Sequence, residues 1–341
     1  MNSERRYDMG VVLAPVNGKG SALRLARAGA RELYMGFYDP AWTEKFGENA
    51  ALNRMSGFGQ EANTLTFAEL VEEIGEARRG FEADGIDNVS LFCVFNAQRY
   101  SAEQTAFIAT NYLPTLAQVG FAGIIVSGPE LIDAAHALSL GAVASTMCAI
   151  YNEDLARYYH ARGIDRAILP RDVTLDDIAS ITAAVPELRY EVFFMRNGCV
   201  FADSHCMGLH KAGCPSTCLA LRYAPSYKQL ATFAGPKPLD PWAWADNDTR
   251  YRNEFHYSAC GLCALWRFEQ MGIDAYKIVG RGDDVDELTS DISLAVENLA
   301  IARECATEAE YLDRMVRPDT IRELCAMGGM SCYYPEPRFG A

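Results

Sequence analysis

The 341-residue sequence has no long hydrophobic run and is poor in basic residues. No apolar segment approaches the ~20 residues that a membrane-spanning helix needs, so we expect no membrane insertion. The opening MNSERRYDMGVV lacks the apolar stretch of a secretory signal, which predicts a cytoplasmic protein. Lys and Arg number 31 against 45 Asp and Glu, giving a net charge of −14. This excess of acid argues against a nucleic-acid groove as the dominant surface.

Three further absences restrict the enzyme class and the domain count. The chain has neither an H-E-x-x-H helix nor a G-x-S-x-G elbow, the signatures of zinc proteases and α/β-hydrolases. A peptidase dyad of Cys206 with His210 or His256 stays open as an alternative. No Pro/Ser-rich linker divides the chain, so we expect one domain over residues 1–341.

Short apolar segments of β type alternate with amphipathic helical patterns over most of the chain. The expected strands are Gly10–Ala14, Glu32–Gly36, Val89–Phe95, Gly123–Ser127, Ala142–Thr146, Arg166–Leu169, Leu188–Phe194 and Ala275–Val279. Eight such βα units predict an α/β protein with a (β/α)8 TIM-barrel-like domain. An open, doubly wound sheet is the alternative.

Helix-start signals support this division. Thr66 with Glu69 and Ser101 with Gln104 have the spacing of capping boxes. Apolar residues at helical spacing follow the first box and also follow the last expected strand. We therefore expect helices after these boxes, and C-terminal helices over residues 284–341 that close the barrel.

Two connections, over residues 37–65 and 195–272, are too long to be simple loops. Both leave the carboxyl ends of expected strands, the face at which barrel enzymes build their active sites. The second is a Cys-rich insertion after the seventh strand, and it holds six of the eleven cysteines. These six are Cys199, Cys206, Cys214, Cys218, Cys260 and Cys263.

The spacing of these cysteines predicts a metal site rather than disulfides, which are rare in the cytoplasm. Thiolates suit iron–sulfur clusters and zinc, and four complete either site. Only Cys260 and Cys263 have the C-x-x-C spacing of a zinc knuckle, so the unequal spacings favour a 4Fe–4S cluster and leave zinc as the alternative. Cys325 and Cys332 fit none of these patterns.

Basic residues follow several of the expected strands. Arg171 comes after the sixth, while Lys277 and Arg281 flank the end of the eighth. Because arginine binds carboxylates in a bidentate manner, these three residues are candidates to hold an anionic substrate. Ion pairing with the many acids of the chain explains them equally well. Arg54, in the first long connection, is a weaker candidate of the same kind.

The insertion is also rich in aromatic residues. They are Trp242, Trp244, Tyr251, Phe255 and Tyr257. They could cover an aromatic substrate, although packing within the insertion is the simpler interpretation. The charges between positions 200 and 259 nearly balance, which leaves RNA as an alternative to a favoured small-molecule substrate.

Several motifs occur in an order that resembles peptidase family U32. They are LAPVNGKGSALRLARAGARELYMG, Asn96 at a strand end, IIVSGPEL, STMCAIYNEDLARYYHARGIDRAILPRDVTLDDI, YEVFFMRNGC and CGLCALWRFEQMGIDAYKIVGR. The resemblance implies that Cys199, Cys206, Cys214 and Cys260 bind a 4Fe–4S cluster. Cys218 and Cys263 are then alternates to these ligands.

The sequence also departs from the family pattern. Asp203 and Ser204 stand where the pattern has Ser-Gly, and Met195 and Arg196 where it has His-Gly. Val279 interrupts the pattern Lys-Ile-Glu-Gly-Arg. These differences indicate a divergent subfamily, so no single member's substrate transfers to this chain.

The resemblance implies an oxygen-independent hydroxylase rather than a protease. Its expected substrate is a small molecule, with an aromatic one included, or an RNA base, and prephenate is the expected oxygen donor. Arg171, Lys277 and Arg281 are then the candidate catalytic residues. Two alternatives remain, a Cys-dependent collagenase-like peptidase and a cluster-bearing redox subunit that works with a partner chain.

Overall fold

The computed structural model describes residues 10–48, 50–54, 63–199, 203–205, 259–317 and 332–339. Within them, parallel strands pair in sequence order and close into a barrel through β8 and β1. The strands are β1 Val11–Pro15, β2 Glu32–Met35, β3 Ser90–Phe95, β4 Gly123–Val126, β5 Gly141–Ala144, β6 Arg166–Ile168, β7 Arg189–Met195 and β8 Ala275–Ile278. The predicted (β/α)8 barrel is confirmed, and the open-sheet alternative is wrong.

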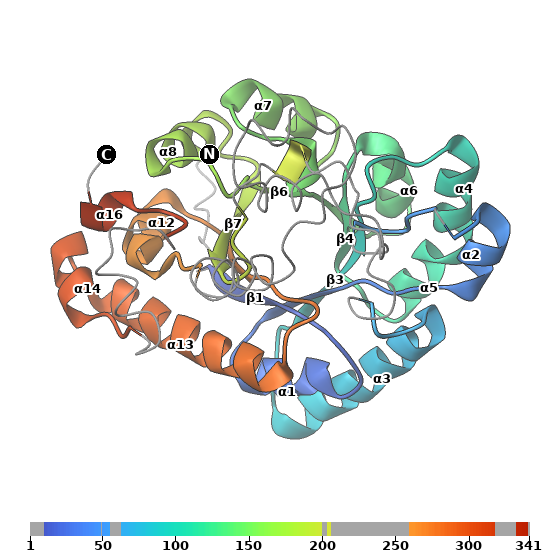
Figure 1. The fold of residues 1–341 in the computed structure, drawn as a ribbon, viewed down its shortest axis with the longest axis horizontal. Helices are drawn as coiled ribbons and strands as arrows, with labels where there is room; N and C mark the ends of the chain where they lie inside the picture. Colours follow the sequence, from blue (N-terminus) through green and yellow to red (C-terminus); the bar gives the residue numbers. More distant parts are fainter. Residues whose placement is uncertain are drawn as a thin grey trace, which may run out of the picture.

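Helices surround the strands as a ring (Figure 1). They are α1 Ser21–Arg27, α2 Pro40–Phe46, α3 Phe67–Asp84, α4 Ala102–Asn111, α5 Leu113–Gln118, α6 Ile132–His136, α7 Glu153–Ala161, α8 Leu175–Ala184, α12 Leu265–Met271, α13 Val285–Glu304, α14 Glu308–Arg314 and α16 Glu336–Phe339. Short 3-10 turns are η2 Pro129–Leu131, η3 Thr146–Cys148, η4 Asp203–His205 and η6 Leu262–Ala264. Among the described residues, no helix combines the length and apolar character needed to cross a membrane.

The expected capping boxes are present. The Thr66 side chain accepts from Glu69 N–H at the start of α3, and Ser101 does the same with Gln104 at the start of α4. The first long connection differs from a plain loop, because Asp39 caps the short helix α2 and Pro40 fits its first position. The division into an insertion over 195–272 and closing helices over 284–341 stays a prediction, since most of the insertion lies outside the described residues.

The strands are buried on both faces, as parallel strands covered by helices must be. Outward side chains pack beneath the helices, whereas inward ones form a separate apolar cluster. The inward cluster consists of Leu13, Tyr34, Phe92, Val94, Ile125, Val143, Ile168, Phe193 and Ala275. This filled interior makes the barrel a packed core, so a ligand site has to lie beyond the strand ends.

One layer of the barrel interior is charged rather than apolar. Arg166 is fully buried, and its guanidinium lies 2.6 Å from Glu32 and 3.2 Å from Glu191. Lys277 Nζ lies 2.8 Å from the other oxygen of Glu191 and 3.8 Å from the centre of the Tyr34 ring. Two cations are thus matched by two carboxylates, which offsets the cost of removing all four from water.

Replacing Arg166 by Met should destabilise the barrel strongly. The change leaves the buried Glu32 and Glu191 without one of their cations, and breaking a buried pair in this way costs about 3–5 kcal/mol. Urea unfolding followed by circular dichroism measures the loss. The matched control is Arg157→Met on α7, where an exposed pair with Asp154 is removed and the stability should stay near that of the wild type. An Arg166 variant as stable as this control would contradict the prediction.

Candidate functional site: the barrel mouth

We call the barrel mouth the carboxyl ends of the strands together with the connections that leave them. Arg171 follows β6, Asp203 follows β7 and Arg281 follows β8, so the topology brings all three to this end. The long connection after β2 contributes Asn53 and Arg54. Such convergence from separate strands is how barrels assemble binding sites.

A buried carboxylate joins two arginines at the mouth. Asp203 Oδ2 lies 2.9 Å from Arg171 Nε, and its Oδ1 lies 2.5 Å from Arg54 Nη1. Although burial opposes ionisation, these two guanidinium groups lower the pKa of Asp203 to about 2. The Asp203 side chain is fully buried, so the carboxylate belongs to the internal structure of the mouth.

Arg171 is fixed by several further contacts. Its Nη1 donates to the Asn197 carbonyl at 2.6 Å, and its guanidinium lies 4.1 Å from the centre of the Phe193 ring. The Tyr333 ring lies on the same guanidinium at 5.9 Å. Burial opposes the charge, but Asp203, Tyr333 and Cys199 together outweigh this effect and raise the pKa of Arg171. Arg171 is therefore a rigid cation that is already matched by a carboxylate.

Lys277 lies deeper, inside the barrel. Its ammonium group pairs with Glu191, and burial lowers the pKa of Lys277 from its ordinary value. This is the ion-pairing interpretation that the sequence left open. The sequence predicts Lys277 at the end of its strand, but the residue lies in the charged layer inside the barrel, below the mouth.

Arg281 differs from the other two cations. It is buried, and its Nη1 donates only to amide oxygens, to Asn63 at 3.2 Å and to Asn53 at 3.4 Å. Among the described residues, no carboxylate pairs with this guanidinium. Burial lowers the pKa of Arg281 to about 10, which still leaves it charged at neutral pH. A buried, charged guanidinium without a carboxylate is a candidate anion site.

The close fit around Arg281 depends on Gly36, at the end of β2. A Cβ at this position would lie 2.4 Å from Arg281 Nη1 and 2.5 Å from Asn63 Oδ1. Any larger residue would therefore push the guanidinium out of its cradle. The sequence signal for this contact is the glycine directly after the Leu-Tyr-Met strand.

Of the four predicted cluster ligands, Cys199 and Cys260 lie within the described residues. Both are half-buried thiols: Cys199 follows β7 in the chain, and Cys260 pairs with Met195 at the end of β7 in an isolated bridge. Burial raises the pKa of the Cys260 thiol to about 12. Cys206 and Cys214 lie outside the described residues, as does the alternate Cys218. In the described part of the chain, no three side chains come together as a metal site.

The donor chemistry at Cys199 and Cys260 fits an iron–sulfur cluster. Neither thiol is in a disulfide, and each has an arginine in its electrostatic surroundings, Arg171 for Cys199 and Arg196 for Cys260. A nearby guanidinium favours the thiolate that a metal requires. The alternate Cys263 is instead buried against Met315, with its sulfur 3.9 Å from the Met315 sulfur.

Sequence reasoning missed the contribution of residues 332–334. Cys332 forms an isolated bridge with Cys260, and the Tyr333 N–H donates to the Cys260 carbonyl at 2.9 Å. The Tyr333 hydroxyl donates to the Arg196 carbonyl, and the Tyr334 hydroxyl to Phe193 at 3.1 Å. Nothing in the local sequence pattern marks these residues, because their partners lie far away in the chain.

Several other predicted features lie outside the described residues. His210 and His256, the histidines of the peptidase alternative, lie outside the described residues. So do all five aromatic residues of the insertion: Trp242, Trp244, Tyr251, Phe255 and Tyr257. Their roles stay predictions.

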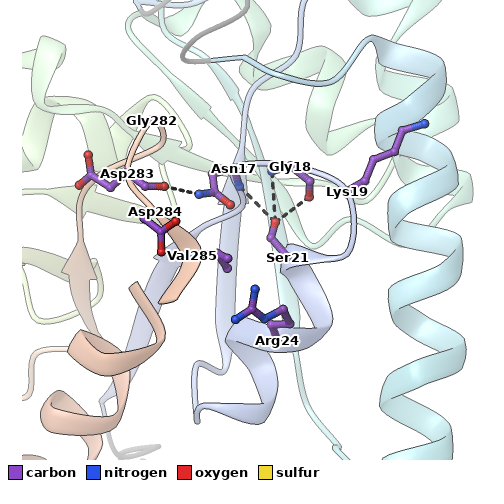
Figure 2. A pocket seen from close by; sticks show the side chains of 9 residues that line it. All are labelled: Asn17, Gly18, Lys19, Ser21, Arg24, Gly282, Asp283, Asp284 and Val285. Carbon is purple, nitrogen blue, oxygen red and sulfur yellow. Dashed lines mark hydrogen bonds between the residues drawn. The ribbon is translucent and has the colours of Figure 1, made fainter. Parts of the chain in front are cut away.

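A separate pocket of about 510 Å³ lies at the rim, between the β1–α1 and β8–α13 connections (Figure 2). Figure 2 shows Asn17 donating across it to the Asp283 carbonyl. Its cations are already matched, because Lys19 lies 3.2 Å from Glu69 and Arg24 pairs with Asp286. The rim pocket therefore offers less to an anion than Arg281 does.

The buried carboxylate gives stability a specific pH dependence. Because the pKa of Asp203 lies below its ordinary value, its ionisation stabilises the fold above about pH 4, and this contribution is lost as the pH falls towards 2. The shift corresponds to about 2 kcal/mol. Asp203→Asn should therefore destabilise the chain at pH 5.5, and its deficit in urea unfolding should shrink towards pH 2.5. The control is Asp172→Asn, which removes an exposed carboxylate from the same connection as Arg171. An equal deficit for Asp203→Asn at every pH would contradict this assignment.

Comparison with known proteins identifies the family. The profile of peptidase family U32 matches residues 21–324, and no curated protein matches the chain. Among solved structures, the U32 peptidase Mk0906 has 9% sequence identity and a TM-score of 0.47, covering 80% of this chain and 94% of its own. Thiamine phosphate pyrophosphorylase from Pyrococcus furiosus has 13% identity and a TM-score of 0.40, covering 85% of this chain and 96% of its own. With the profile matched over most of its length, the chain belongs to peptidase family U32.

Proposed function

We propose that this chain is an iron–sulfur enzyme that hydroxylates a small anionic molecule without using oxygen gas. The observation that carries the proposal is Arg281, a buried cation without a carboxylate partner among the described residues, at the same end of the barrel as Cys199 and Cys260. An anion site at the same end of the barrel as candidate metal-binding thiols favours a cofactor-dependent enzyme with its own substrate over a redox subunit without one.

Cys199 and Cys260 would hold the 4Fe–4S cluster together with Cys206 and Cys214, which the family resemblance implies. When bound, the cluster would supply electron transfer at the mouth, which no side chain of the protein can provide. Zinc remains the alternative metal. Cys263, packed against Met315, would serve the core rather than the cluster.

Arg281 would bind and orient the substrate. Its Nη1 is held by the side-chain oxygens of Asn53 and Asn63, which fixes the plane of the guanidinium. A carboxylate that binds in this plane accepts two N–H groups and replaces the water lost on burial. The fixed plane would hold the reacting part of the substrate in one orientation, which is the main contribution a protein makes to cofactor chemistry.

Arg171 and Lys277 would act differently from Arg281. Each is already paired with a carboxylate of the protein, so neither needs a substrate anion to balance its charge. Arg171 would stabilise the side of the mouth by packing against the Phe193 and Tyr333 rings. Lys277, deeper in the barrel, would keep a proton on Nζ, which donates to Glu191. The expected dicarboxylate prephenate would then be held by Arg281 through one carboxylate.

Anaerobically purified protein should be brown and carry about four iron and four sulfide per chain. Replacing Cys199, Cys206, Cys214 or Cys260 singly by Ala should bleach the absorption of the cluster. Cys263→Ala is the matched control and should keep it, because that thiol packs against Met315. Colourless protein that contains zinc would reject the cluster, and cleavage of casein that thiol alkylation blocks would favour the peptidase alternative.

Arg281→Met should weaken the binding of prephenate by roughly 10- to 100-fold, since a hydrogen bond to a charged group contributes about 1.5–3 kcal/mol. Isothermal titration calorimetry with prephenate measures the change. Arg24→Met, which removes a rim cation paired with Asp286, is the control and should bind as the wild type does. Unchanged affinity in the Arg281 variant would exclude this residue as the anchor, and a wild type that does not bind prephenate would exclude that donor.

A further inference from the structure

The carboxylate of Asp203 is buried and contacts two arginines, which distinguishes it from an ion pair on the protein surface. This carboxylate is fully buried and is shared by guanidinium groups from two different connections, Arg171 after β6 and Arg54 after β2. Exposed ion pairs are worth little, but a buried carboxylate with two charge-assisted partners is expensive to separate. This three-residue contact therefore fixes Asp203 itself at the rim of the barrel.

Both arginines are held in place independently of Asp203. The backbone N–H of Arg54 donates to Asn96 Oδ1 at 3.0 Å, which ties the β2 connection to the end of β3. The Arg171 guanidinium lies 4.1 Å from the centre of the Phe193 ring on β7. The two cations thus form a preorganised receptor for a carboxylate at the rim of the barrel, and the 3-10 turn of Asp203 supplies that carboxylate.

The position of Asp203 in the sequence links this contact to two of the predicted cluster ligands. It lies four residues after Cys199 and three residues before Cys206, within the segment that carries two predicted cluster ligands. A neutral side chain at this position could not balance two guanidinium charges.

We infer that Asp203 is a positioning residue, which fastens the segment carrying Cys199 to the barrel rim through Arg54 and Arg171. The cluster-binding role of this segment rests on the proposed function, whereas the fastening itself does not. Because Asp203 occupies the arginine pair, that pair is not a site for the substrate carboxylate, which is left to Arg281. Arg54 and Arg171 thus stabilise the protein structure, whereas Arg281 is left to bind the ligand.

The test compares Asp203→Asn with Arg54→Met. Both variants break the contact, but they change the charge at the mouth in opposite directions. In cluster-free protein, iodoacetamide should alkylate Cys199 at least ten times faster in both variants than in the wild type, as followed by peptide mass spectrometry. The buried Cys93 reports on global unfolding and should stay unreactive. Asp172→Asn, an exposed carboxylate that accepts from Tyr151, should leave the rate at Cys199 unchanged.

In protein loaded with iron and sulfide, the same two variants should release iron to a chelator at least ten times faster than the wild type or Asp172→Asn. Faster alkylation in Asp203→Asn together with slower alkylation in Arg54→Met would reveal an electrostatic effect on the thiol and overturn the inference. Unchanged rates at Cys199 in both variants would overturn it as well.

If Cys93 also becomes reactive in Asp203→Asn, the decision rests on Arg54→Met, whose side chain is less buried. A faster rate at Cys199 with Cys93 still protected would then support the fastening, and an unchanged rate would overturn it. A further outcome is that neither the variants nor the wild type take up a cluster while the variants still show faster alkylation of Cys199. In that case the proposed function fails and the role of Asp203 stands.

Discussion

The need to match every buried charge governs the interior and the mouth of this barrel. Removing an ion from water is so costly that a buried charge persists only with a partner. Glu32 and Glu191 match Arg166 and Lys277 inside the barrel, and Asp203 matches Arg171 at its mouth. The same rule makes Arg281 informative. Its amide partners satisfy hydrogen bonds, but within the part of the chain that the structure describes they supply no negative charge, and this is why we propose Arg281 as the anion site.

Features encoded locally could be predicted from the sequence. The eight strands are recognisable because parallel strands covered on both faces consist of short apolar runs, and each observed strand overlaps its predicted range. The capping boxes of α3 and α4 are equally local, since each involves residues three apart. The helix α2 was missed within a long connection, although Asp39-Pro40 is a helix-start signal.

The partners of the charged residues could not be predicted in this way. Arg171, Lys277 and Arg281 look alike in the sequence, and only the fold shows that the first two have carboxylates and the third has amides. Asp203 stands out in the sequence only as a departure from the family pattern, and nothing there shows that it binds two arginines. The contacts of Cys332 and Tyr333 join segments that no periodic pattern connects. Ion pairs across a barrel join residues that are close in space but distant in the sequence, so composition and spacing do not reveal them.

The contacts of Tyr333 also set the order in which the mouth can be built during protein synthesis. Its hydroxyl binds the carbonyl of Arg196, which lies 137 residues earlier in the chain. A ribosome therefore has to translate the whole barrel, the insertion and helices α13 and α14 before this contact can form. The loop entropy of such a distant contact also makes it a late step in folding. Cys260, whose carbonyl accepts from Tyr333, thus gains its final surroundings only after every strand of the barrel exists.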